Sequence, residues 1–545
     1  MGTVLIDGIE VEIGDGERLN GIQAARLAGK EVPHYCWHAG LSVVASCRMC
    51  LVETGRRDPE TGHISMVPKL VPACQTPATN DTVFITDSKK VMDARALVEE
   101  DLLIRHPIDC PICDKAGECY LQDYHFEHGR DERRADLQPF TSRRRSLGDT
   151  VTLFVDRCVM CSRCVRFCRE VTGTRELMVV NRGSHEEIDV FPGFPLKNKM
   201  AGNVVDLCPV GALGDKDFLY QQRVWFMNGH DHVCGGCSTG CSIRVEENQD
   251  RIYRVKPREN QQINQWWMCD DGRYGWHYIH DSNRVTGPQR RAGEQTVEWD
   301  QILADLDAEL RNRGRIAAVL SPFQTVEEAY LLAQYVRSID AEALLGVGPI
   351  PLEGKDESFV NNFTIRAEKC PNRKGVQHVV AGVQGDHVDW RTFQEKLDAD
   401  DSIQAVWVVG GGPSQCDLYG EQSIASLRRR ATLIVQDLFP TTLWKAADYQ
   451  LSTPAFAERA GSFVNHADRL QSVDWAVRPP AGVYTDGQLY WRLLARNGLY
   501  QADVVRRELA AEIGYFALAG EEIPRDGVCL TLNQLAVDST SVGPA

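Results

Sequence analysis

The chain has 545 residues, too many for one compact core, so we expect about three to five domains. Hydrophobic residues make up 43% and charged residues 25% of it, as in ordinary soluble proteins. The formal net charge of −16 argues against general nucleic-acid binding, which favours a basic surface. No signal peptide is visible, and no run approaches the roughly 20 apolar residues of a membrane-spanning helix. We therefore expect a cytoplasmic chain that meets a membrane only indirectly, through a larger assembly.

The N-terminal residues predict a hairpin followed by a short helix. Thr3–Ile6 and Ile9–Ile13 flank Asp7-Gly8, a pair typical of two-residue hairpin turns. Asn20 is placed to cap a helix that stops at Gly29. A hairpin, a helix and then a cysteine-bearing loop indicate a small β-grasp domain of the plant-ferredoxin kind.

The first cysteine array in this domain suits a [2Fe–2S] cluster. It has a long first gap, a tight Cys-x2-Cys pair and a remote fourth cysteine, and its members are Cys36, Cys47, Cys50 and Cys74. Small residues in its loop would let backbone N–H groups turn toward sulfur, and such hydrogen bonds tune a cluster's potential. Zinc is the alternative, but a zinc ribbon normally has two tight pairs and this segment has one. Arg56–Pro68 is an apparent inserted hairpin or loop before the fourth cysteine.

The second array needs a histidine, because only three cysteines are available nearby. Ser88 predicts the start of a helix that ends at His106-Pro107, beside the cysteine loop. The expected ligands of a [4Fe–4S] cluster are His106, Cys110, Cys113 and Cys119. His125 and His128 compete for the histidine role, and His106 is preferred because Pro107 fixes the local turn. Arg130–Arg145, polar and rich in arginine, indicates a linker or a surface crossing.

The third array has the short-spaced triplet and remote Cys-Pro of bacterial ferredoxins. Its members are Cys158, Cys161, Cys164 and Cys208, the last followed by Pro209. A single Cys-x2-Cys pair could equally bind zinc, but three cysteines at two-residue gaps favour [4Fe–4S]. Cys168 extends the triplet, yet no second triplet precedes Cys208 and residue 169 is not proline, so we interpret Cys168 as a core thiol.

The fourth array follows a different spacing and closes after two tryptophans. Its members are Cys234, Cys237, Cys241 and Cys269. Zinc is the alternative on spacing alone, and the position after a ferredoxin-like unit favours a further [4Fe–4S] cluster. Four cysteines remain unassigned: Cys168, Cys370, Cys416 and Cys529. In a reducing compartment, close cysteine pairs bind metal more readily than they form disulfides.

Beyond about residue 283 the pattern changes to α/β layering. Arg315–Leu320 predicts a buried strand, and Thr325-x-x-Glu328 is a capping box that opens a helix to about Val336. Ser402–Val409 and Thr432–Val435 repeat the buried-strand pattern, which indicates a parallel sheet. The glycines that begin at Gly410 lack Rossmann spacing, and a plain turn is preferred there to a phosphate site.

The expected fold class is thus multidomain α+β and α/β. We expect a [2Fe–2S] plant-ferredoxin-like β-grasp domain, a [4Fe–4S] domain with one histidine and three cysteine ligands, a ferredoxin-like [4Fe–4S] domain, an additional [4Fe–4S] domain and a C-terminal α/β domain. Their respective ranges are residues 1–87, 88–140, 141–225, 226–282 and 283–545.

The four arrays in this order resemble the large iron–sulfur subunit of NADH–quinone oxidoreductase, respiratory complex I. The segments that carry the likeness best are Ser46–Glu53, His106–Pro111 and Asp206–Leu213. The likeness spans about residues 1–280. The remainder is more loosely similar to the molybdopterin-oxidoreductase-like region of that subunit, with Glu458–Asn465 as the matching segment.

The resemblance implies one [2Fe–2S] and three [4Fe–4S] clusters on the four arrays, the fourth off the main electron path. Electrons would arrive from a flavin on the partner subunit that binds NADH. They would pass through the clusters of residues 36–74, 106–119 and 158–208 to downstream iron–sulfur subunits and a quinone, coupled in the whole complex to proton translocation. The expected location is the peripheral arm, on the cytoplasmic side of the cell inner membrane. No catalytic residue is expected in the chain itself.

Departures from the family and rival interpretations qualify this expectation. The C-terminal region is short, and Cys370 lies in a polar stretch without a supporting motif, so we expect a truncated α/β domain without molybdopterin. The nearest rival is the electron-transfer subunit of a soluble NAD-linked formate dehydrogenase or hydrogenase. From another class, a zinc-binding assembly scaffold uses the same ligand types.

Overall fold

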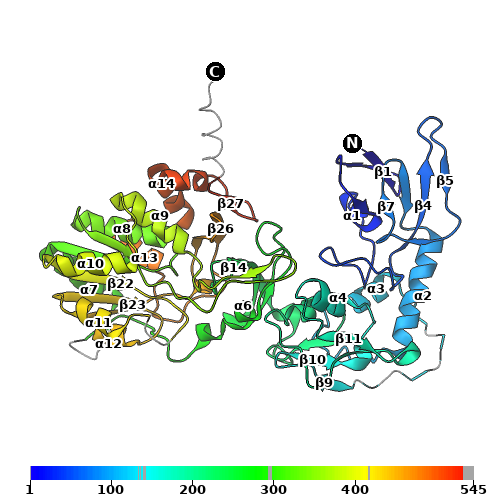
Figure 1. Ribbon diagram of the computed structural model, residues 1–545, viewed down its shortest axis with the longest axis horizontal. Helices are drawn as coiled ribbons and strands as arrows, with labels where there is room; N and C mark the ends of the chain where they lie inside the picture. Colours follow the sequence, from blue (N-terminus) through cyan, green and yellow to red (C-terminus); the bar gives the residue numbers. More distant parts are fainter. Residues whose placement is uncertain are drawn as a thin grey trace. The chain divides into compact units, whose positions relative to one another are not determined.

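The computed structural model describes residues 2–132, 134–135, 137–138, 141, 143–291, 297–414 and 418–531. The chain divides into two compact units (Figure 1). The first unit comprises Met1–Met227 and Phe359–Asn362, and the second comprises Asn228–Ser358 and Phe363–Ala545. No helix of the described residues is long and apolar enough to cross a membrane.

The first unit begins with a mixed sheet of order β2-β1-β8-β4-β5, in which β6 also pairs with β4. Its strands are β1 (Gly2–Ile6), β2 (Ile9–Ile13), β4 (Leu51–Arg57), β5 (Ile64–Met66), β6 (Val71–Pro72) and β8 (Thr82–Ile85). β1 and β2 form the predicted hairpin across Asp7 and Gly8, whose φ angles are 46° and 84°. β4 and β5 form a second hairpin, and the end of β4, the turn and all of β5 lie in the segment predicted to be an insertion.

Helix α1 (Gly21–Leu27) packs its apolar side against this sheet. Asn20 caps it as predicted: its side chain accepts from the Gln23 N–H, and the Gln23 side chain accepts from the Asn20 N–H. Gly21 is required by close packing, because a Cβ there would lie 2.9 Å from the Phe84 ring. Two short strands, β3 (Leu19–Asn20) and β7 (Pro77–Ala78), pair beside it. The hairpin, sheet and helix together support the loop that carries the first cysteine array.

The rest of the first unit is built from short elements around the second and third arrays. Its helices are α2 (Lys89–Arg105), α3 (Tyr120–His128), α4 (Arg163–Glu170) and α5 (Asn203–Leu207). Its strands are β9 (Arg144–Ser146), β10 (Val151–Phe154), β11 (Leu177–Val180), β12 (Glu187–Val190) and β13 (Leu213–Asp215). Ser88 caps α2, and His106 is its C-cap, both as predicted. The predicted linker over residues 130–145 ends in strand β9, and several of its residues lie outside those described.

The second unit starts with a three-stranded antiparallel sheet of β14 (Asn228–Val233), β15 (Ser242–Asn248) and β16 (Arg251–Pro257). Helix α6 (Asp270–Tyr274) follows it. Further on, β25 (Gly461–Val464), β26 (Arg469–Val473) and β27 (Val528–Cys529) form another small sheet, and β20 (Glu357–Ser358) pairs with β21 (Thr364–Ile365).

A six-stranded sheet of order β17-β24-β23-β22-β18-β19 forms the centre of the second unit, and all its pairs except β17–β24 are parallel. Its strands are β17 (Gln289–Arg290), β18 (Arg315–Leu320), β19 (Leu344–Val347), β22 (Ile403–Val409), β23 (Thr432–Asp437) and β24 (Tyr449–Ser452). The predicted strands match β18, β22 and β23. The predicted parallel sheet is therefore confirmed.

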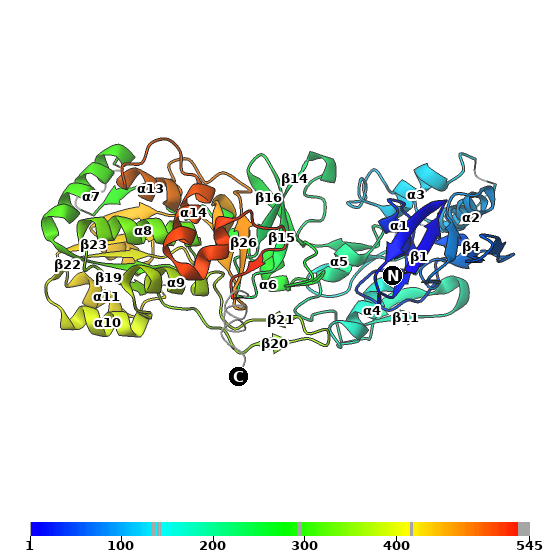
Figure 2. The ribbon, with the colours of Figure 1, turned by 90° about the horizontal axis from the view of Figure 1, so that it is seen from above.

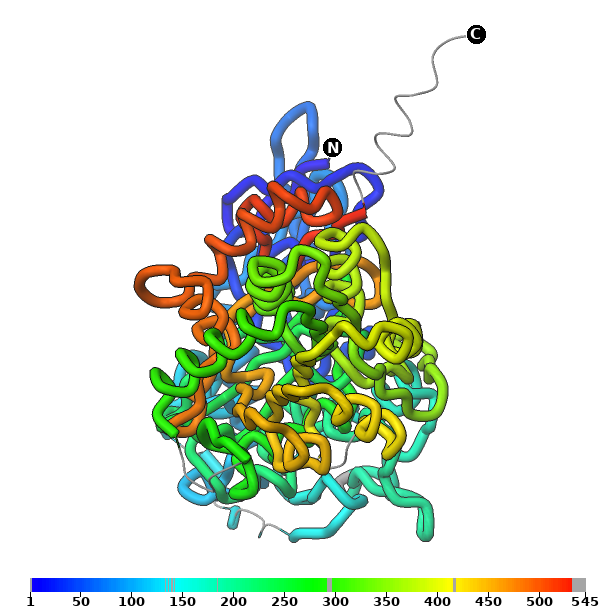
Figure 3. Tube along the Cα trace, turned by 90° about the vertical axis from the view of Figure 1, so that its left-hand side faces the viewer, coloured from blue at the N-terminus to red at the C-terminus, as the bar shows by residue number. Residues whose placement is uncertain are grey.

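Helices cover both faces of this sheet (Figure 2). One apolar core contains Ile316, Ala318 and Leu320 of β18, and the opposite core contains Ala317 and Val319, as the alternation of side chains along a strand requires. The first core is closed by α7 (Trp299–Arg313), α8 (Val326–Ile339), α9 (Arg373–Gln384), α13 (Asp486–Leu493) and α14 (Ala502–Glu512). The second is closed by α10 (Trp390–Ala399), α11 (Glu421–Arg428) and α12 (Thr442–Ala446). Figure 3 views this unit from the end where α7, α10 and α11 lie.

Candidate iron–sulfur centres

The first array is a set of four sulfurs in direct contact. Cys36 lies within hydrogen-bond reach of Cys47 and Cys74, and Cys50 lies within reach of Cys74. The loop between α1 and β4 carries three of these cysteines, and its turns use left-handed backbone at Ala45 (φ 52°). The proximity lowers the pKa of Cys36 and raises the pKa of Cys47 and Cys74, because neighbouring thiols share protons unequally.

Backbone N–H groups point at this array, as the small residues of its loop predict. The N–H groups of Ser46 and Cys47 donate to the Cys36 sulfur, and the Met49 N–H donates to Cys47. Such donors stabilise negative charge on sulfur. Four mutually close and mostly buried sulfurs with backbone donors fit a small two-iron cluster.

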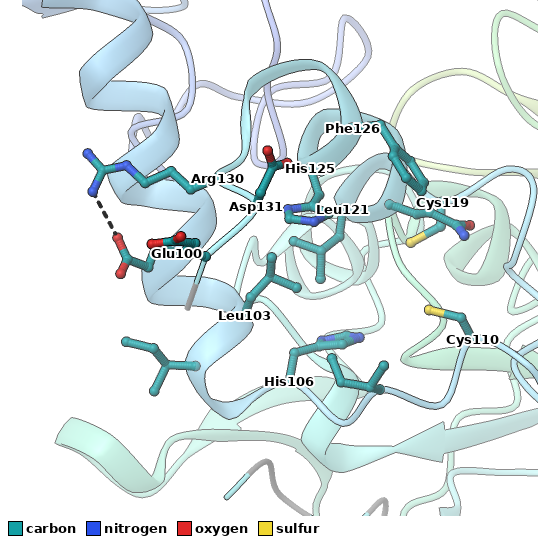
Figure 4. Close-up of a pocket in the computed structure, with 14 residues that line it drawn as sticks. Glu100, Leu103, His106, Cys110, Cys119, Leu121, His125, Phe126, Arg130 and Asp131 are labelled. Carbon is teal, nitrogen blue, oxygen red and sulfur yellow. Dashed lines mark ion pairs between the residues drawn. The ribbon is translucent and has the colours of Figure 1, made fainter. Parts of the chain in front are cut away.

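Three of the four expected ligands of the second array line a cavity of about 370 Å³: His106, Cys110 and Cys119 (Figure 4). Helix α2 ends at His106, which delivers its imidazole to the cavity. Burial, assisted by the nearby Arg157 cation, lowers the pKa of His106 to about 4. The imidazole is therefore neutral near pH 7, the form in which a histidine ligates metal. Burial also raises the pKa of the Cys119 thiol to about 11.

The fourth expected ligand, Cys113, does not line this cavity. Its sulfur lies against Gly211 of the third array's Cys-Pro segment, where a Cβ would come within 2.1 Å of it. Glycine is therefore required at this contact. The structure brings His106, Cys110 and Cys119 together and leaves Cys113 beside them.

Two of the three candidate histidines for this site line the cavity, His106 and His125. His125 lines it from α3, and its buried Nδ1 has no hydrogen-bond partner within the described ranges, while His128 is not among the lining residues. The geometry keeps His106 and His125 as candidates and disfavours His128.

The third array encloses one small cavity with all four expected cysteines on its wall: Cys158, Cys161, Cys164 and Cys208. Left-handed backbone at Met160 (φ 48°) and Ser162 (φ 57°) curls the triplet around the cavity, and the Met160 N–H donates to the Cys158 sulfur at 3.4 Å. Burial raises the pKa of Cys161 to about 11, so binding iron must release protons from these thiols. Cys168 is fully buried in α4 and is not on the cavity wall, which agrees with its interpretation as a core thiol.

The fourth array lies in the second unit and again surrounds one small cavity with Cys234, Cys237, Cys241 and Cys269 on its wall. The loop from β14 to β15 supplies three of them, and Cys269 is the N-cap of α6. The Gly236 N–H donates to Cys234 and the Gly272 N–H donates to Cys269, both at 3.4 Å. Gly272 also allows close approach, since a Cβ there would lie 2.9 Å from the Cys234 sulfur.

The cavities at the third and fourth arrays test whether these residues fit clusters. In both, sulfurs with opposed N–H donors face a shared, enclosed and largely apolar space. All four cysteines of each set line the same cavity, so the donor set, four sulfurs around one space, fits the thiolate ligation of an iron–sulfur cluster.

The structure adds neighbours that the spacing of cysteines did not predict. Lys369 lines the fourth cavity and lies 3.6 Å from Asp271. The next residue, Cys370, is fully buried. Cys529 is half-buried beside Thr531, and Cys416 lies outside the described residues. Lys369 is distant from the array in sequence, so no local motif could have indicated it.

In the turn after β22, the N–H groups of Gly410 and Gly411 are occupied. The Gly410 N–H donates to the Gln436 carbonyl at 2.8 Å, and the Gly411 N–H donates to the Asp437 carboxylate at 3.1 Å. A phosphate-binding loop needs such N–H groups free for its ligand. This favours the plain turn.

The folds and cysteine sets define a multidomain iron–sulfur protein, and four family models match it in series. A "2Fe-2S iron-sulfur cluster binding domain" covers residues 2–89 and an "NADH-ubiquinone oxidoreductase-G iron-sulfur binding region" covers 95–134. The "ferredoxin-like domain" of NADH-quinone oxidoreductase subunit 3 covers 148–214, and a "Molybdopterin oxidoreductase Fe4S4 domain" covers 230–281. Each range contains one complete array.

The chain is similar to the G subunit of NADH-quinone oxidoreductase, as its motifs indicated. It is 33% identical to that protein of Rickettsia felis over 61% of this chain and 48% of the relative. It is 32% identical to the NADH-ubiquinone oxidoreductase 75 kDa subunit of Reclinomonas americana, over 68% of this chain and 53% of the relative. The chain thus spans about half the length of these curated relatives. Among solved structures, a chain of an NAD⁺-reducing [NiFe]-hydrogenase in the H2-reduced state aligns at 25% identity with a TM-score of 0.33, covering 41% of this chain and 91% of that one.

Proposed function

We propose that this chain is an iron–sulfur electron-transfer subunit of an NADH:quinone oxidoreductase of the complex I type. The arrays would hold one [2Fe–2S] cluster and three [4Fe–4S] clusters, on the fifteen cysteines and one histidine assigned from the sequence. A bound cluster supplies the capacity to accept and release an electron. The protein residues hold each cluster, exclude water and direct N–H donors at sulfur, which sets its potential.

The observation that carries the proposal is the direct linkage of the three arrays of the first unit. The Tyr120 N–H, next to Cys119, donates to the Pro209 carbonyl, next to Cys208, at 2.9 Å. The Arg166 guanidinium donates both to the Cys36 carbonyl and to the Cys161 carbonyl. One hydrogen bond thus joins the second and third arrays, and one side chain joins the first and third.

We infer from these links that the third array stands between the other two in the electron path. The order 36–74, then 158–208, then 106–119 differs from the order along the chain that the sequence suggested. The first and second arrays also approach each other through the hydrogen bond from the His34 N–H to the Tyr124 hydroxyl at 3.2 Å. That contact lies several residues from any second-array ligand, so the route through the third array is more direct.

The partners proposed are a flavin- and NADH-binding subunit on the donor side and further iron–sulfur subunits on the acceptor side. The location proposed is the peripheral arm of the complex on the cytoplasmic side of the inner membrane. We assign the N-terminal sheet and helix to a β-grasp domain and the C-terminal sheet to a molybdopterin-oxidoreductase-like scaffold without the cofactor. Interpretation as a scaffold is supported by the apolar cores on both faces of the sheet and by buried ionic side chains that pair with one another, among them Glu328 and Arg459.

The order of transfer can be tested in the assembled oxidoreductase by rapid-freeze EPR after NADH addition. In a Cys161→Ala variant, we expect the [2Fe–2S] signal to appear at the wild-type rate and the signal from the His106 site to be delayed at least about tenfold. A Cys168→Ala variant is the matched control, since this thiol is off the cavity wall and should leave both rates unchanged. An undelayed signal from the His106 site in Cys161→Ala would contradict the proposed order.

A further inference from the structure

Helix α4 carries two buried arginines, Arg163 and Arg166, that connect the first and third arrays. They are 4% and 2% exposed. Residues three apart lie on one face of a helix, so both guanidinium groups reach in the same direction. Cys164 lies between them in sequence and faces the third cavity.

Both arginines donate to backbone carbonyls of the two ligand loops. Arg166 binds the Ser42 and Cys36 carbonyls in the first loop, and the Cys161 carbonyl at 3.3 Å in the third. Arg163 binds the Trp37 carbonyl on one side and the Leu207 carbonyl, at 3.3 Å, on the other. Each guanidinium therefore binds a carbonyl in both ligand loops. In each loop that carbonyl belongs to an expected ligand or to its neighbour in sequence.

Both arginines bond to backbone carbonyls, and no carboxylate in the described part of the chain pairs with either of them. Glu170, the carboxylate on the same helix, pairs with Arg169 instead. The Arg163 Nε is buried with no hydrogen-bond partner among the residues that the structure describes, and Arg163 lies on the wall of the third cavity. Burying an unpaired cation is costly, so such groups are retained where a nearby negative charge compensates them. Thiolates of the two arrays, and the clusters that they bind, supply that negative charge.

We propose that Arg163 and Arg166 form a cationic bridge that raises the reduction potentials of the clusters at the first and third arrays together. This inference rests on the proposed function of those arrays. Each cluster gains one negative charge when it takes up an electron, and a fixed cation in a low-dielectric interior stabilises that charge. The bridge acts through position and charge, and neither arginine ligates iron.

The test is a redox titration of the holoprotein followed by low-temperature EPR. In Arg166→Gln, the reduced-to-oxidised ratio of both the [2Fe–2S] cluster and the third-array cluster should fall at least about tenfold at a given potential. For a one-electron couple that fall is a shift of about 59 mV. Arg163→Gln should shift the same two clusters in the same direction. Arg166→Lys keeps the charge and should shift them less than Arg166→Gln does.

Two controls separate charge from structural damage. The fourth-array signal, in the other unit, should keep its potential in every variant. Arg430→Gln removes a buried arginine that likewise donates to three backbone carbonyls, those of Leu397, Asp400 and Ile403, and should leave all potentials unchanged.

Unchanged potentials in both glutamine variants would overturn the bridge, as would an Arg166→Lys shift as large as that of Arg166→Gln. If Arg166→Gln loses its clusters, Arg163→Gln and Arg166→Lys decide in the same way. Wild-type protein without these cluster signals would instead refute the proposed function, so the two failures are distinguishable.

Discussion

At the scale of single residues, the histidine ligand of the second array is the assignment with a direct competitor, because the imidazoles of His106 and His125 line the same cavity. His106 ends α2 beside the cysteine loop, and its low pKa leaves a free lone pair at neutral pH. We expect His106→Ala to abolish or reshape one tetranuclear EPR signal and to spare the others. His125→Ala is the matched variant from the same cavity and should leave every signal in place. The reverse pattern would transfer the ligand role to His125.

A second residue-scale prediction concerns Glu99, a fully buried carboxyl in α2 that accepts from the Tyr35 hydroxyl. Burial raises the pKa of Glu99 to about 7. The folded state therefore holds a proton that the unfolded chain, with an ordinary pKa of about 4.3, has lost. The contribution of the protonated Glu99 to the free energy of unfolding is therefore complete below about pH 4.3 and is lost as the pH rises through about 7.

Glu99→Gln mimics the protonated carboxyl and removes this dependence. The free energy of unfolding of the variant, relative to that of the wild type, should rise between pH 5 and pH 8. The rise is about 1.4 kcal/mol for each tenfold difference in proton affinity between the folded and unfolded wild type. Thermal melts across this pH range measure it. Exposed Asp101 on the same helix supplies the control substitution, Asp101→Asn, for which no such trend is expected. A difference that stays constant across this pH range would refute the account of Glu99.

Residue types and spacing indicated the ligand sets because thiolate ligands are chemically specific and most of them are local in sequence. The arginines that join the arrays could not be predicted in the same way. Arg166 lies 130 residues from Cys36, whose carbonyl it binds. From sequence alone, an arginine side chain is expected to lie in solvent. The need for glycine at position 211 could not be predicted either, because it comes from the close approach of the Cys113 sulfur in the folded chain.

At the scale of elements, α8 depends on a buried ionic network rather than on its cap alone. Thr325 and Glu328 form the predicted capping box, and Glu328 also accepts from Arg459, with both partners at most 2% exposed. Arg459→Met would leave the buried carboxylate unpaired, so we expect a loss of about 3–5 kcal/mol in the free energy of unfolding of this unit. Urea unfolding of the holoprotein measures it.

The control for this loss is Arg391→Met, which removes an ion pair with Glu395 on the surface of α10, where both side chains are well exposed. Exposed pairs of this spacing contribute about 0.3–0.5 kcal/mol. Equal losses in the two variants would show that burial of the network adds nothing.

Elements were predictable where local signals agreed with the tertiary fold. The Asp7-Gly8 hairpin, the Asn20 and Ser88 caps and strand β18 formed where the sequence placed them, because turn chemistry, capping and apolar runs all favoured the same structure. Helix α8 continues to Ile339, three residues beyond the predicted end, where the partly buried Ile339 still packs against the core. The short strands β9 and β11 carried no such signal; β9 pairs with β10, and β11 pairs with β12.

At the scale of the whole molecule, the first unit gathers three arrays and the second holds the fourth beside a large α/β sheet. Chain order did not predict which arrays contact each other, because the third array's ligand loops touch both of the others through distant segments. The composition, in contrast, already separated the cysteine-rich first half from the α/β half.

Iron and acid-labile sulfide analysis combined with EPR of the anaerobically purified, reduced full chain tests the central claim most directly. The account predicts iron and sulfide in equal amounts, one binuclear and three tetranuclear signals, and no bound zinc. Folded protein that carries zinc, or that lacks iron and sulfide after anaerobic handling, would contradict it.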